Sequence, residues 1–358
     1  MIEIQRRIAA APKPLPQPES LGFGKYFSDH WFYSRYLDPK GWIEARIEPY
    51  GPIPMDPAAS VLHYGQSLFE GMKAFKQVDG SIAVFRPDFN YDRMAQGSER
   101  MCLVPPSREL FMSGLGELLR VDERWVPSSE GAALYIRPTL IGTEGFLGVR
   151  PSREILFFIL LSPVGSYYST GSSPVKIYVE NKVMRAAPGG MGSTKAGANY
   201  AASLRSALDA KAKGYAQVLW LESDHDTIQE VGTMNVFFVF KNEIVTPELN
   251  GNILAGGVRE SVIHLLKHMG KPIKERQITM TELLERINKG DLMEAFGTGT
   301  AAVISPIGEL HVSGENYVIN NNEWGTVSQD LYKFITGLQR GREKDIFNWM
   351  VPVEALRW

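Results

Sequence analysis

The chain has 358 residues, of which 44% are hydrophobic and 22% are charged, and 38 basic against 40 acidic side chains leave a formal net charge of −2. This length favours about two domains, and the apolar fraction excludes a disordered or fibrous chain. The near-neutral charge provides no global field for nucleic acid or for an anionic membrane surface. The apolar run from Ile155 to Leu161 is far shorter than the ~20 residues of a membrane-spanning helix, so we expect no membrane segment.

The N-terminal segment carries four prolines at alternate positions between Pro12 and Pro18. Proline fixes φ and donates no backbone hydrogen bond, so we expect residues 1–20 to form an extended, solvated leader. The segment also lacks the long apolar core of a secretory signal. Cys102 is the only cysteine, so an intrachain disulfide is excluded, and the sequence predicts a reducing, cytoplasmic location.

The first half of the chain mixes strand and helix patterns. Apolar residues recur at helical spacing in two segments despite three internal glycines, and β-rich runs surround these segments. The patterns predict strands at 42–50, 81–86, 132–142 and 154–161, and helices at 91–103 and 110–121. A Gly- and Ser-rich stretch then predicts an interdomain linker at 166–175.

The pattern starts again after this linker. We expect strands at 175–180, 218–222 and 235–240, and helices at 198–214, at 258–269 and from Thr281 onward. Strands and helices in both halves indicate an α/β or α+β fold. The predicted domains are a smaller one at 1–165 and a larger one at 176–358.

The segment M-R-A-A-P-G-G-M-G-S-T-K-A-G-A-N-Y is rich in glycine and contains Lys195. A phosphate-binding P-loop needs Gly directly before its lysine and Ser or Thr directly after it, whereas Thr194 and Ala196 stand there. A lysine among small residues suits another task, because a flat aromatic cofactor can approach its amine closely. Burial and a nearby cation would lower the pKa of that amine and prepare it for a Schiff base. A solvated loop lysine is the alternative.

Two further segments carry candidate groups. Glu230 lies in Q-E-V-G-T-M-N directly before a strongly apolar strand, where a buried carboxylate needs a partner. That partner is either an arginine or a protonated pyridine nitrogen. The turn F-G-T-G-T-A-A offers backbone N–H groups that suit a phosphate, although an ordinary loop fits the same pattern.

Taken together, these segments resemble the branched-chain amino acid aminotransferases, which are pyridoxal-phosphate enzymes of fold type IV. H-Y-G-Q-S-L-F-E-G-M-K-A-F, Y-I-R-P-T-L-I-G-T-E, the Lys195 segment and E-V-G-T-M-N occur in order and at family spacing. The likeness runs from about residue 22 to the C-terminus. It implies a two-domain α/β (α+β) fold like that of D-amino acid aminotransferase, with pyridoxal 5′-phosphate bound by the larger domain and a site between the domains.

The resemblance assigns roles to eight cofactor residues. Lys195 matches the Schiff-base lysine, which acts as general base and then general acid between Cα and C4′. Glu230 matches the carboxylate that keeps the pyridine nitrogen protonated. The others are Tyr200 at the phenolic oxygen, Arg93 at the phosphate, Arg185 near the cofactor, Thr233 at a cofactor position, and Val258 and Thr300 at phosphate positions served partly by backbone N–H groups.

The resemblance also outlines a substrate pocket. The matched positions are Phe27, Tyr64, Phe69, Tyr135, Arg137, Tyr167 and Ala301. Among these, Tyr64 and Arg137 are candidates to meet the distal carboxylate of glutamate. Leu147 and Val149 match a loop that, in the family, reaches the pocket of the neighbouring subunit, so we expect a homodimer.

The activity implied by the resemblance is amino transfer from L-leucine, L-isoleucine or L-valine to 2-oxoglutarate, in a ping-pong reaction through pyridoxamine phosphate that serves branched-chain amino acid metabolism. The partners expected are these small molecules and a second copy of the chain, without nucleic acid, membrane or metal. The alternatives are another fold-type IV activity, such as a D-amino acid or (R)-amine transaminase or aminodeoxychorismate lyase, and a non-catalytic binding protein on the same scaffold.

Several residues depart from the family pattern or have plainer explanations. Ala302 and Ser305 replace a C-x-x-C pair found in some animal members, so thiol regulation is not expected. Ala198 stands where glycine is usual, and Gly257 stands where a branched residue is usual, so that loop is expected to be more mobile. His264 and His268 lie four residues apart on a predicted helix, where a surface role is favoured over metal binding. The aromatic residues expected in the core are Phe157, Phe158, Phe237, Phe238 and Phe240.

Overall fold

The computed structural model describes residues 3–165 and 173–357, and its chain divides into two compact units. The first unit contains residues up to 165 together with 194–197 and 337–357. The second unit contains 173–193 and 198–336. Each unit is built on one mixed sheet with helices, so the prediction of a two-unit α/β fold is confirmed.

The first unit is built on a nine-stranded sheet among the described residues. Its strand order is β1-β3-β2-β8-β7-β5-β6-β18, with β4 paired to β7, and all pairs are antiparallel except β1 with β3. The elements are β1 Ile4–Arg6, η1 Pro18–Ser20, β2 His30–Leu37, β3 Gly41–Pro49, α1 Ser60–Tyr64, β4 Ser67–Phe69, β5 Met72–Lys76, β6 Ile82–Phe85, α2 Pro87–Arg100, α3 Arg108–Val121, η2 Glu123–Trp125, β7 Ala133–Gly142, β8 Glu154–Val164, β18 Met350–Pro352 and η4 Val353–Ala355.

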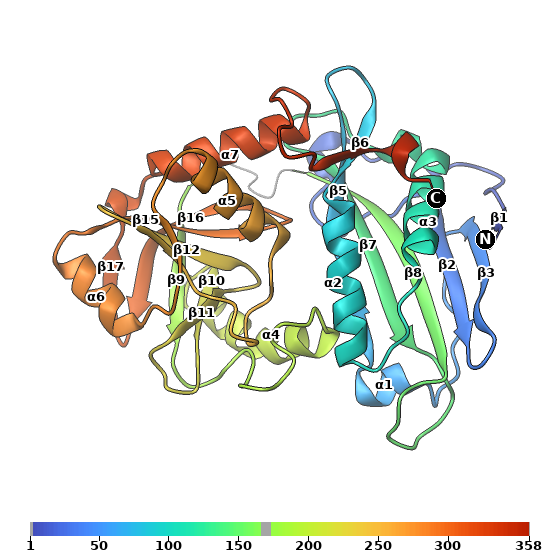
Figure 1. Ribbon diagram of the computed structural model, residues 1–358, viewed down its shortest axis with the longest axis horizontal. Coiled ribbons are helices and arrows are strands. Elements are labelled where there is room, and N and C mark those ends of the chain that lie inside the picture. The colour runs from blue at the N-terminus through green and yellow to red at the C-terminus, as the bar shows by residue number, and fades with distance from the viewer. Residues whose placement is uncertain (1–2, 166–172, 358) are drawn as a thin grey trace. The chain divides into compact units, whose positions relative to one another are not determined.

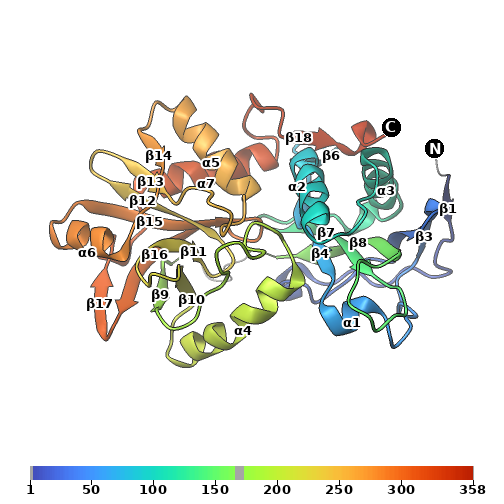
Figure 2. The ribbon, with the colours of Figure 1, turned by 60° about the horizontal axis from the view of Figure 1, so that its bottom comes forward.

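The second unit has a nine-stranded mixed sheet in its described part, in the order β11-β10-β9-β16-β15-β12-β13-β14, with β17 paired to β16. Figure 2 shows α4 on one side of this sheet and α5 on the other. The elements are β9 Val175–Glu180, α4 Gly197–Ala212, β10 Gln217–Leu221, β11 Ile228–Val231, β12 Asn235–Phe240, β13 Ile244–Thr246, α5 Gly257–His268, β14 Ile273–Glu275, α6 Met280–Asn288, β15 Leu292–Gly299, β16 Val303–Val312, β17 Glu315–Val318, η3 Asn320–Asn322 and α7 Thr326–Gln339.

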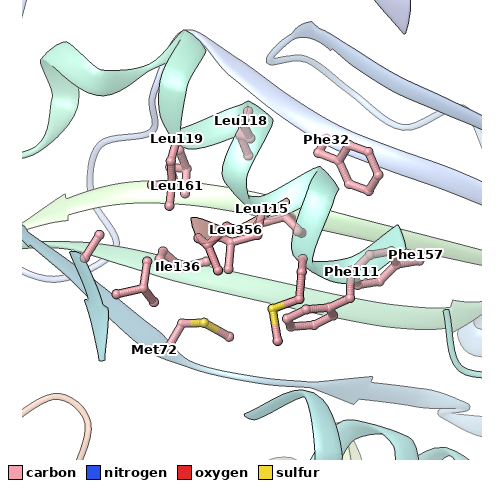
Figure 3. Close-up of a cluster of buried hydrophobic side chains, with 14 of the residues drawn as sticks. Phe32, Met72, Phe111, Leu115, Leu118, Leu119, Ile136, Phe157, Leu161 and Leu356 are labelled. Atoms are coloured by element: carbon pink, nitrogen blue, oxygen red, sulfur yellow. The ribbon is translucent and has the colours of Figure 1, made fainter. Parts of the chain in front are cut away.

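The core of the first unit lies between its sheet and α2 and α3, which run side by side on one face (Figure 1). Figure 3 shows Phe111 of α3 near Phe157 of β8, and their stacked rings are 5.6 Å apart. Position 114 of α3 has no room for a side chain, because a Cβ on Gly114 would lie 2.6 Å from the ring of Phe32. The helix therefore uses Gly114 to bring its backbone close to the sheet. The five aromatic residues expected in the core are buried, which confirms that prediction.

The N-terminal segment is extended and its side chains are exposed or half-buried, as expected, and it is also attached to the first unit. Ile4 of β1 pairs with Ala45 of β3 and packs against the hydrophobic core. The N–H of Ala9 donates to Nε2 of His30 over 2.9 Å, and the N–H of Lys13 donates to a carboxylate oxygen of Asp29 over 2.7 Å. Backbone N–H groups of non-proline residues in this segment therefore donate hydrogen bonds to the first unit. The segment is extended and attached to that unit.

Two segments that the sequence analysis placed in the larger domain belong to the first unit. Met350 of β18 pairs with Phe85 of β6, so the C-terminal segment extends the first sheet. Ala196 forms a β-bridge with Leu68 of β4. Residues 166–172 of the predicted linker lie outside the described residues.

Candidate active site

Lys195 is held beside β4 of the first unit by backbone contacts. The N–H of Phe69 donates to the carbonyl of Lys195 over 3.1 Å, and the next residue, Ala196, bridges to Leu68. Gly97 of α2 makes room for this arrangement, because a Cβ at Gly97 would lie 2.9 Å from Leu68 and 3.3 Å from Thr194. The glycine inside the helix therefore lets α2 approach the strand and the residue before the lysine.

The amine of Lys195 lies among cations and aromatic rings. Its Nζ is 5.0 Å from the centroid of the Phe69 ring. Burial, together with the positive charges of Arg93 and Arg137, lowers the pKa of Lys195 from 10.5 to about 8, although Glu70 and Tyr135 act in the opposite direction. A larger share of this amine is therefore neutral near physiological pH than for a solvated lysine, as a general base or nucleophile requires.

Arg93 is fixed by a carboxylate that the sequence analysis did not select. Glu70 lies between β4 and β5 and is fully buried. It accepts from Nε of Arg93 over 2.7 Å and from Nη2 of Arg93 over 2.6 Å, and Asn90 donates to the same carboxylate over 2.7 Å. Glu70 belongs to the S-L-F-E-G segment that carries the resemblance, but nothing in that segment identifies Arg93 as its partner.

Tyr135 and Arg137 of β7 form the next part of this first group. Nη2 of Arg137 donates to the hydroxyl of Tyr135 over 2.9 Å, and its guanidinium lies 4.6 Å from the Phe69 ring centroid. Gly71 provides space for the phenol, since a Cβ there would lie 2.1 Å from the hydroxyl oxygen. The predicted residues brought together in the first unit are therefore Lys195, Arg93, Phe69, Tyr135 and Arg137.

A second group lies in the second unit. Four predicted cofactor residues line one small cavity there: Arg185, Tyr200, Glu230 and Thr233. The same cavity is lined by Asn199, whose side-chain amide donates to the carbonyl of Met191 over 2.7 Å. Residues far apart in the sequence thus share one cavity.

Glu230 of β11 is buried, and its Oε1 has two polar contacts. The N–H of Leu254 donates to it over 2.7 Å, and Nη2 of Arg185 lies 3.5 Å away. Asn235, which the sequence analysis did not select, donates to the carbonyl of Leu254 over 2.9 Å. Glu230 and Asn235, at opposite ends of the E-V-G-T-M-N segment, therefore hold the peptide groups of Leu254.

Three other predicted residues lie at backbone turns of the second unit. Val258 is in the first turn of α5, and Thr300 and Ala301 are in the turn between β15 and β16. The α5 turn is close-packed, because a Cβ at Gly256 would lie 2.1 Å from the side-chain oxygen of Asn235. A helix N-terminus presents backbone N–H groups, which suit an anion such as phosphate.

The remaining predicted residues are placed differently. The ring of Phe27 stacks on Tyr50 at 4.9 Å. The hydroxyl of Tyr64 donates to the carbonyl of Leu147. The side chains of this β7–β8 connection are exposed, with Leu147 at 60% and Val149 at 84%. Tyr167 lies outside the described residues.

Phe23 is an aromatic residue near the first group that the sequence analysis did not select. Its ring meets that of Tyr135 edge-on at 4.9 Å, although half of Phe23 is exposed. The F-G-K-Y-F spacing offers two phenylalanines four residues apart, and the sequence gives no sign of which one contacts Tyr135.

Two other surface features of the described residues, a groove and a pair of histidines, lie apart from the predicted site residues. A groove of about 910 Å³ in the first unit is lined by residues such as Trp31, Glu48 and Met55, and none of the predicted site residues lines it. His264 and His268 are exposed, and the described residues contain no metal-binding group of three or more His, Cys, Asp or Glu side chains. Within residues 3–165 and 173–357, no helix combines the length and apolar character needed to cross a bilayer.

Comparison with known proteins identifies the family of this chain. The family model for class IV amino-transferases matches residues 67–310. The chain is 48% identical over 354 residues to branched-chain-amino-acid aminotransferase 2 of Bacillus subtilis (strain 168), covering 99% of this chain and 98% of that protein. The fold and the sequence are thus those of a class IV aminotransferase.

Solved structures show the same fold. A branched-chain aminotransferase of the archaeon Thermoproteus uzoniensis, solved with norvaline, aligns with a TM-score of 0.74 and 26% identity over 90% of this chain and 99% of that one. A branched-chain amino acid aminotransferase from Thermobaculum terrenum, solved in its PLP-bound holo-form, aligns with a TM-score of 0.76 and 22% identity over 91% and 98% of the two chains. The chain belongs to the branched-chain-amino-acid aminotransferases.

The residues present fit pyridoxal phosphate, the cofactor of this family. Among the described residues, Nε of Arg185 is buried without a hydrogen-bond partner, in a side chain that lines the same cavity as Tyr200 and Glu230. A buried polar atom of this kind calls for a partner from a bound group or water. The lowered pKa of Lys195 matches the chemistry of an amine that condenses with an aldehyde.

Proposed function

We propose that this protein transfers the amino group of L-leucine, L-isoleucine or L-valine to 2-oxoglutarate, with Lys195 as the residue that holds the cofactor and moves the proton. The observation that carries this proposal is the environment of the Lys195 amine. Burial, together with the nearby charges of Arg93 and Arg137, lowers the pKa of this amine to about 8. The 48% identity to a branched-chain-amino-acid aminotransferase over nearly the whole chain supports the substrate class.

The residues of the two groups have complementary tasks. Pyridoxal phosphate, when bound, supplies an electron-accepting ring that stabilises negative charge on the substrate α-carbon. Glu230 keeps the ring nitrogen protonated, and Arg93 gives charge-assisted hydrogen bonds to the phosphate. The backbone N–H groups at Val258 and Thr300 add phosphate contacts, Tyr200 donates to the phenolic oxygen, and Arg185 and Thr233 complete the cofactor contacts.

Lys195 performs the proton transfer at the substrate. With pyridoxal phosphate and substrate bound, the neutral amine of Lys195 would take the proton from the substrate α-carbon and return it to C4′. A pKa near 8 suits this alternation because both protonation states are accessible near physiological pH.

The substrate pocket combines apolar and cationic groups. In the first unit, Phe69, Tyr135 and Phe27 accept an aliphatic side chain, and Arg137 meets a substrate carboxylate. One methylene in such a pocket changes discrimination by only about 1–3 kcal/mol, so leucine, isoleucine and valine should all react.

The proposed assembly is a cytoplasmic homodimer. Leu147 and Val149 supply the partner's pocket, and their strong exposure supports this role. The hydroxyl of Tyr64 donates to the carbonyl of Leu147, so Tyr64 contacts the same loop. The single cysteine, Cys102, suits a reducing compartment.

Complementation between inactive variants tests the dimer. Lys195→Ala and the loop variant Leu147→Asp/Val149→Asp are each expected to have little activity. Refolding an equal mixture should restore roughly a quarter of the wild-type rate, because a mixed dimer has one site with both an intact lysine and an intact loop. A mixture no more active than its components would contradict supply of the loop in trans.

An absorbance titration tests the reaction itself. Adding L-leucine without 2-oxoglutarate should abolish the near-visible absorbance band of the cofactor, and 2-oxoglutarate should restore it. D-Alanine serves as the control and should leave the band unchanged. Loss of the band with D-alanine but not with L-leucine would instead support a D-amino acid transaminase.

A further inference from the structure

Glu70 is the buried centre of a polar network beside the proposed cofactor residues. It lies in the two-residue link between β4 and β5, and its N–H donates to the carbonyl of Pro138 over 2.8 Å. Its carboxylate accepts from Arg93 through both Nε and Nη2, at 2.7 and 2.6 Å, and from Asn90 at 2.7 Å. The N–H of Gly71 adds a longer contact of 3.3 Å.

This geometry restricts the guanidinium of Arg93. A two-nitrogen contact with a carboxylate fixes both the plane and the direction of an arginine side chain. Asn90 and Arg93 lie three residues apart on α2, so they share one face of the helix, and both reach Glu70. The backbone anchor to Pro138 ties the carboxylate to β7, the strand that carries Tyr135 and Arg137.

We propose that Glu70 is a positioning residue for cofactor binding: it holds Arg93 in the orientation that receives the phosphate, and it keeps a negative charge beside the Lys195 amine. This inference rests on the roles proposed above for Arg93 and Lys195. Glu70 itself needs no contact with the cofactor.

Backbone geometry and electrostatics support the second part, because Glu70 directly follows Phe69, whose N–H donates to the carbonyl of Lys195 over 3.1 Å. Burial and the charges of Arg93 and Arg137 lower the pKa of the amine, whereas the charge of Glu70 raises it. Without Glu70, the pKa of Lys195 should fall below about 8, because two cations would then act on the amine without this counter-charge.

Comparing the binding of two ligands separates an effect on phosphate binding from a general effect on folding. Apoenzyme is titrated with pyridoxal 5′-phosphate and with pyridoxal, which lacks the phosphate. Glu70→Gln keeps the side-chain shape but removes the charge, and it should weaken pyridoxal phosphate binding about tenfold relative to pyridoxal. A merely structural role would weaken both ligands equally, leave their affinity ratio unchanged and overturn the proposal.

Control variants cover the other outcomes. Glu117→Gln removes a carboxylate of the same unit that pairs with Arg6 and Arg120, and it should preserve the ratio. If Glu70→Gln does not fold, Asn90→Ala removes one donor to Glu70 and should reduce the ratio in the same direction by a smaller factor. An unchanged ratio in folded Asn90→Ala would overturn the proposal.

Arg93→Lys distinguishes the inference from its premise. It should abolish most of the preference for pyridoxal phosphate, and Glu70→Gln should add little to it in the double variant. If Arg93→Lys keeps the full preference, the phosphate role of Arg93 is wrong and the inference fails with it. If Arg93→Lys loses the preference and Glu70→Gln keeps it, only the role of Glu70 is wrong.

The pKa of the Lys195 amine is measured in enzyme without cofactor. Apoenzyme is treated briefly with acetic anhydride at a series of pH values, and acetylation of Lys195 is followed by peptide mass spectrometry. The midpoint should be near pH 8 in the wild type and lower in Glu70→Gln. An unchanged midpoint would contradict the electrostatic part of the proposal.

Discussion

Arg185 and Glu230 form a buried ion pair in the second unit, with Nη2 of the arginine 3.5 Å from Oε1 of the glutamate. The same arginine nitrogen donates to the carbonyl oxygens of Gly192 and Asn252, which hold the guanidinium in place. The N–H of Leu254 donates to the same Oε1. These contacts stabilise a negatively charged carboxylate inside the cavity lined by Tyr200 and Thr233.

Replacing Glu230 should therefore impair the chemistry more than the fold. In Glu230→Gln the charge that keeps the ring nitrogen protonated is lost, and we expect kcat for L-leucine to fall at least about a hundredfold. Steady-state rates with 2-oxoglutarate measure this. Glu222→Gln, a carboxylate outside the cavity that accepts from Asn250, is the control. A Glu230→Gln enzyme within twofold of the wild type would refute the assigned role.

The contact between Gly71 and Tyr135 predicts an effect on substrate binding. The Cβ of Gly71→Ala would lie 2.1 Å from the tyrosine hydroxyl, so the phenol must move and its bond with Arg137 is lost. We expect kcat/KM for L-leucine to fall about tenfold, corresponding to about one lost hydrogen bond. Tyr135→Phe in the same chain removes the oxygen and should make the added methyl less harmful. Equal losses from Gly71→Ala in both backgrounds would argue against this clash.

Phe23 and Phe27 offer a matched pair of aromatic substitutions. Phe23→Ala removes the ring that contacts Tyr135, so KM for L-leucine should rise several-fold, in line with about 1 kcal/mol for an aromatic pair. Phe27, the proposed pocket residue, stacks on Tyr50 rather than on Tyr135, so Phe27→Ala should have the smaller effect on KM. KM values for L-leucine and L-valine in both variants test this order, and a larger effect of Phe27→Ala would contradict the predicted contribution of the contact between Phe23 and Tyr135.

Lys73 of β5 predicts a pH-dependent stability. Burial, with a contribution from Arg340, lowers the pKa of its amine from 10.5 to about 8. Between these values the unfolded chain holds a proton that the folded chain does not, so stability rises with pH. At about 1.4 kcal/mol per pKa unit, the wild type should gain about 3 kcal/mol over Lys73→Met between pH 8 and 10.5.

Urea unfolding of the wild type and Lys73→Met at several pH values in this window measures that difference. Lys195 is present in both proteins, so its own titration cancels. Lys76→Met, which removes an exposed lysine of the same strand, is the control and should show no such trend. A stability difference between wild type and Lys73→Met that stays constant with pH would contradict a lowered pKa of Lys73.

Local patterns predicted the elements with simple periodicity. The strands at 175–180 and 235–240 are found with those bounds as β9 and β12, because their apolar runs end at turn residues. The helix expected at 91–103 instead begins at Pro87, whose fixed φ suits the first helical turn, and it ends at Arg100. Boundaries that depend on proline and capping were thus less well predicted than the strands.

Long-range pairing explains what the sequence analysis missed. No local pattern indicates that β18 joins β6, or that Ala196 bridges to Leu68, and both segments were placed in the wrong unit. The sequence motifs identified Lys195 and Glu230, because the residues next to them in the sequence indicate their chemistry. Glu70 was missed because its partner, Arg93, lies on a different element and meets it only in the folded chain.

The central claim is that one amine, that of Lys195, carries the cofactor. Borohydride reduction of the holoenzyme followed by peptide mass spectrometry locates the pyridoxyl group directly. The account predicts the modification on the peptide containing Lys195, and no modification of that peptide in Lys195→Ala. Lys73 is the informative competitor, because burial lowers the pKa of its amine to about 8 as well. A pyridoxyl group on Lys73, or on any lysine other than Lys195, would contradict the account.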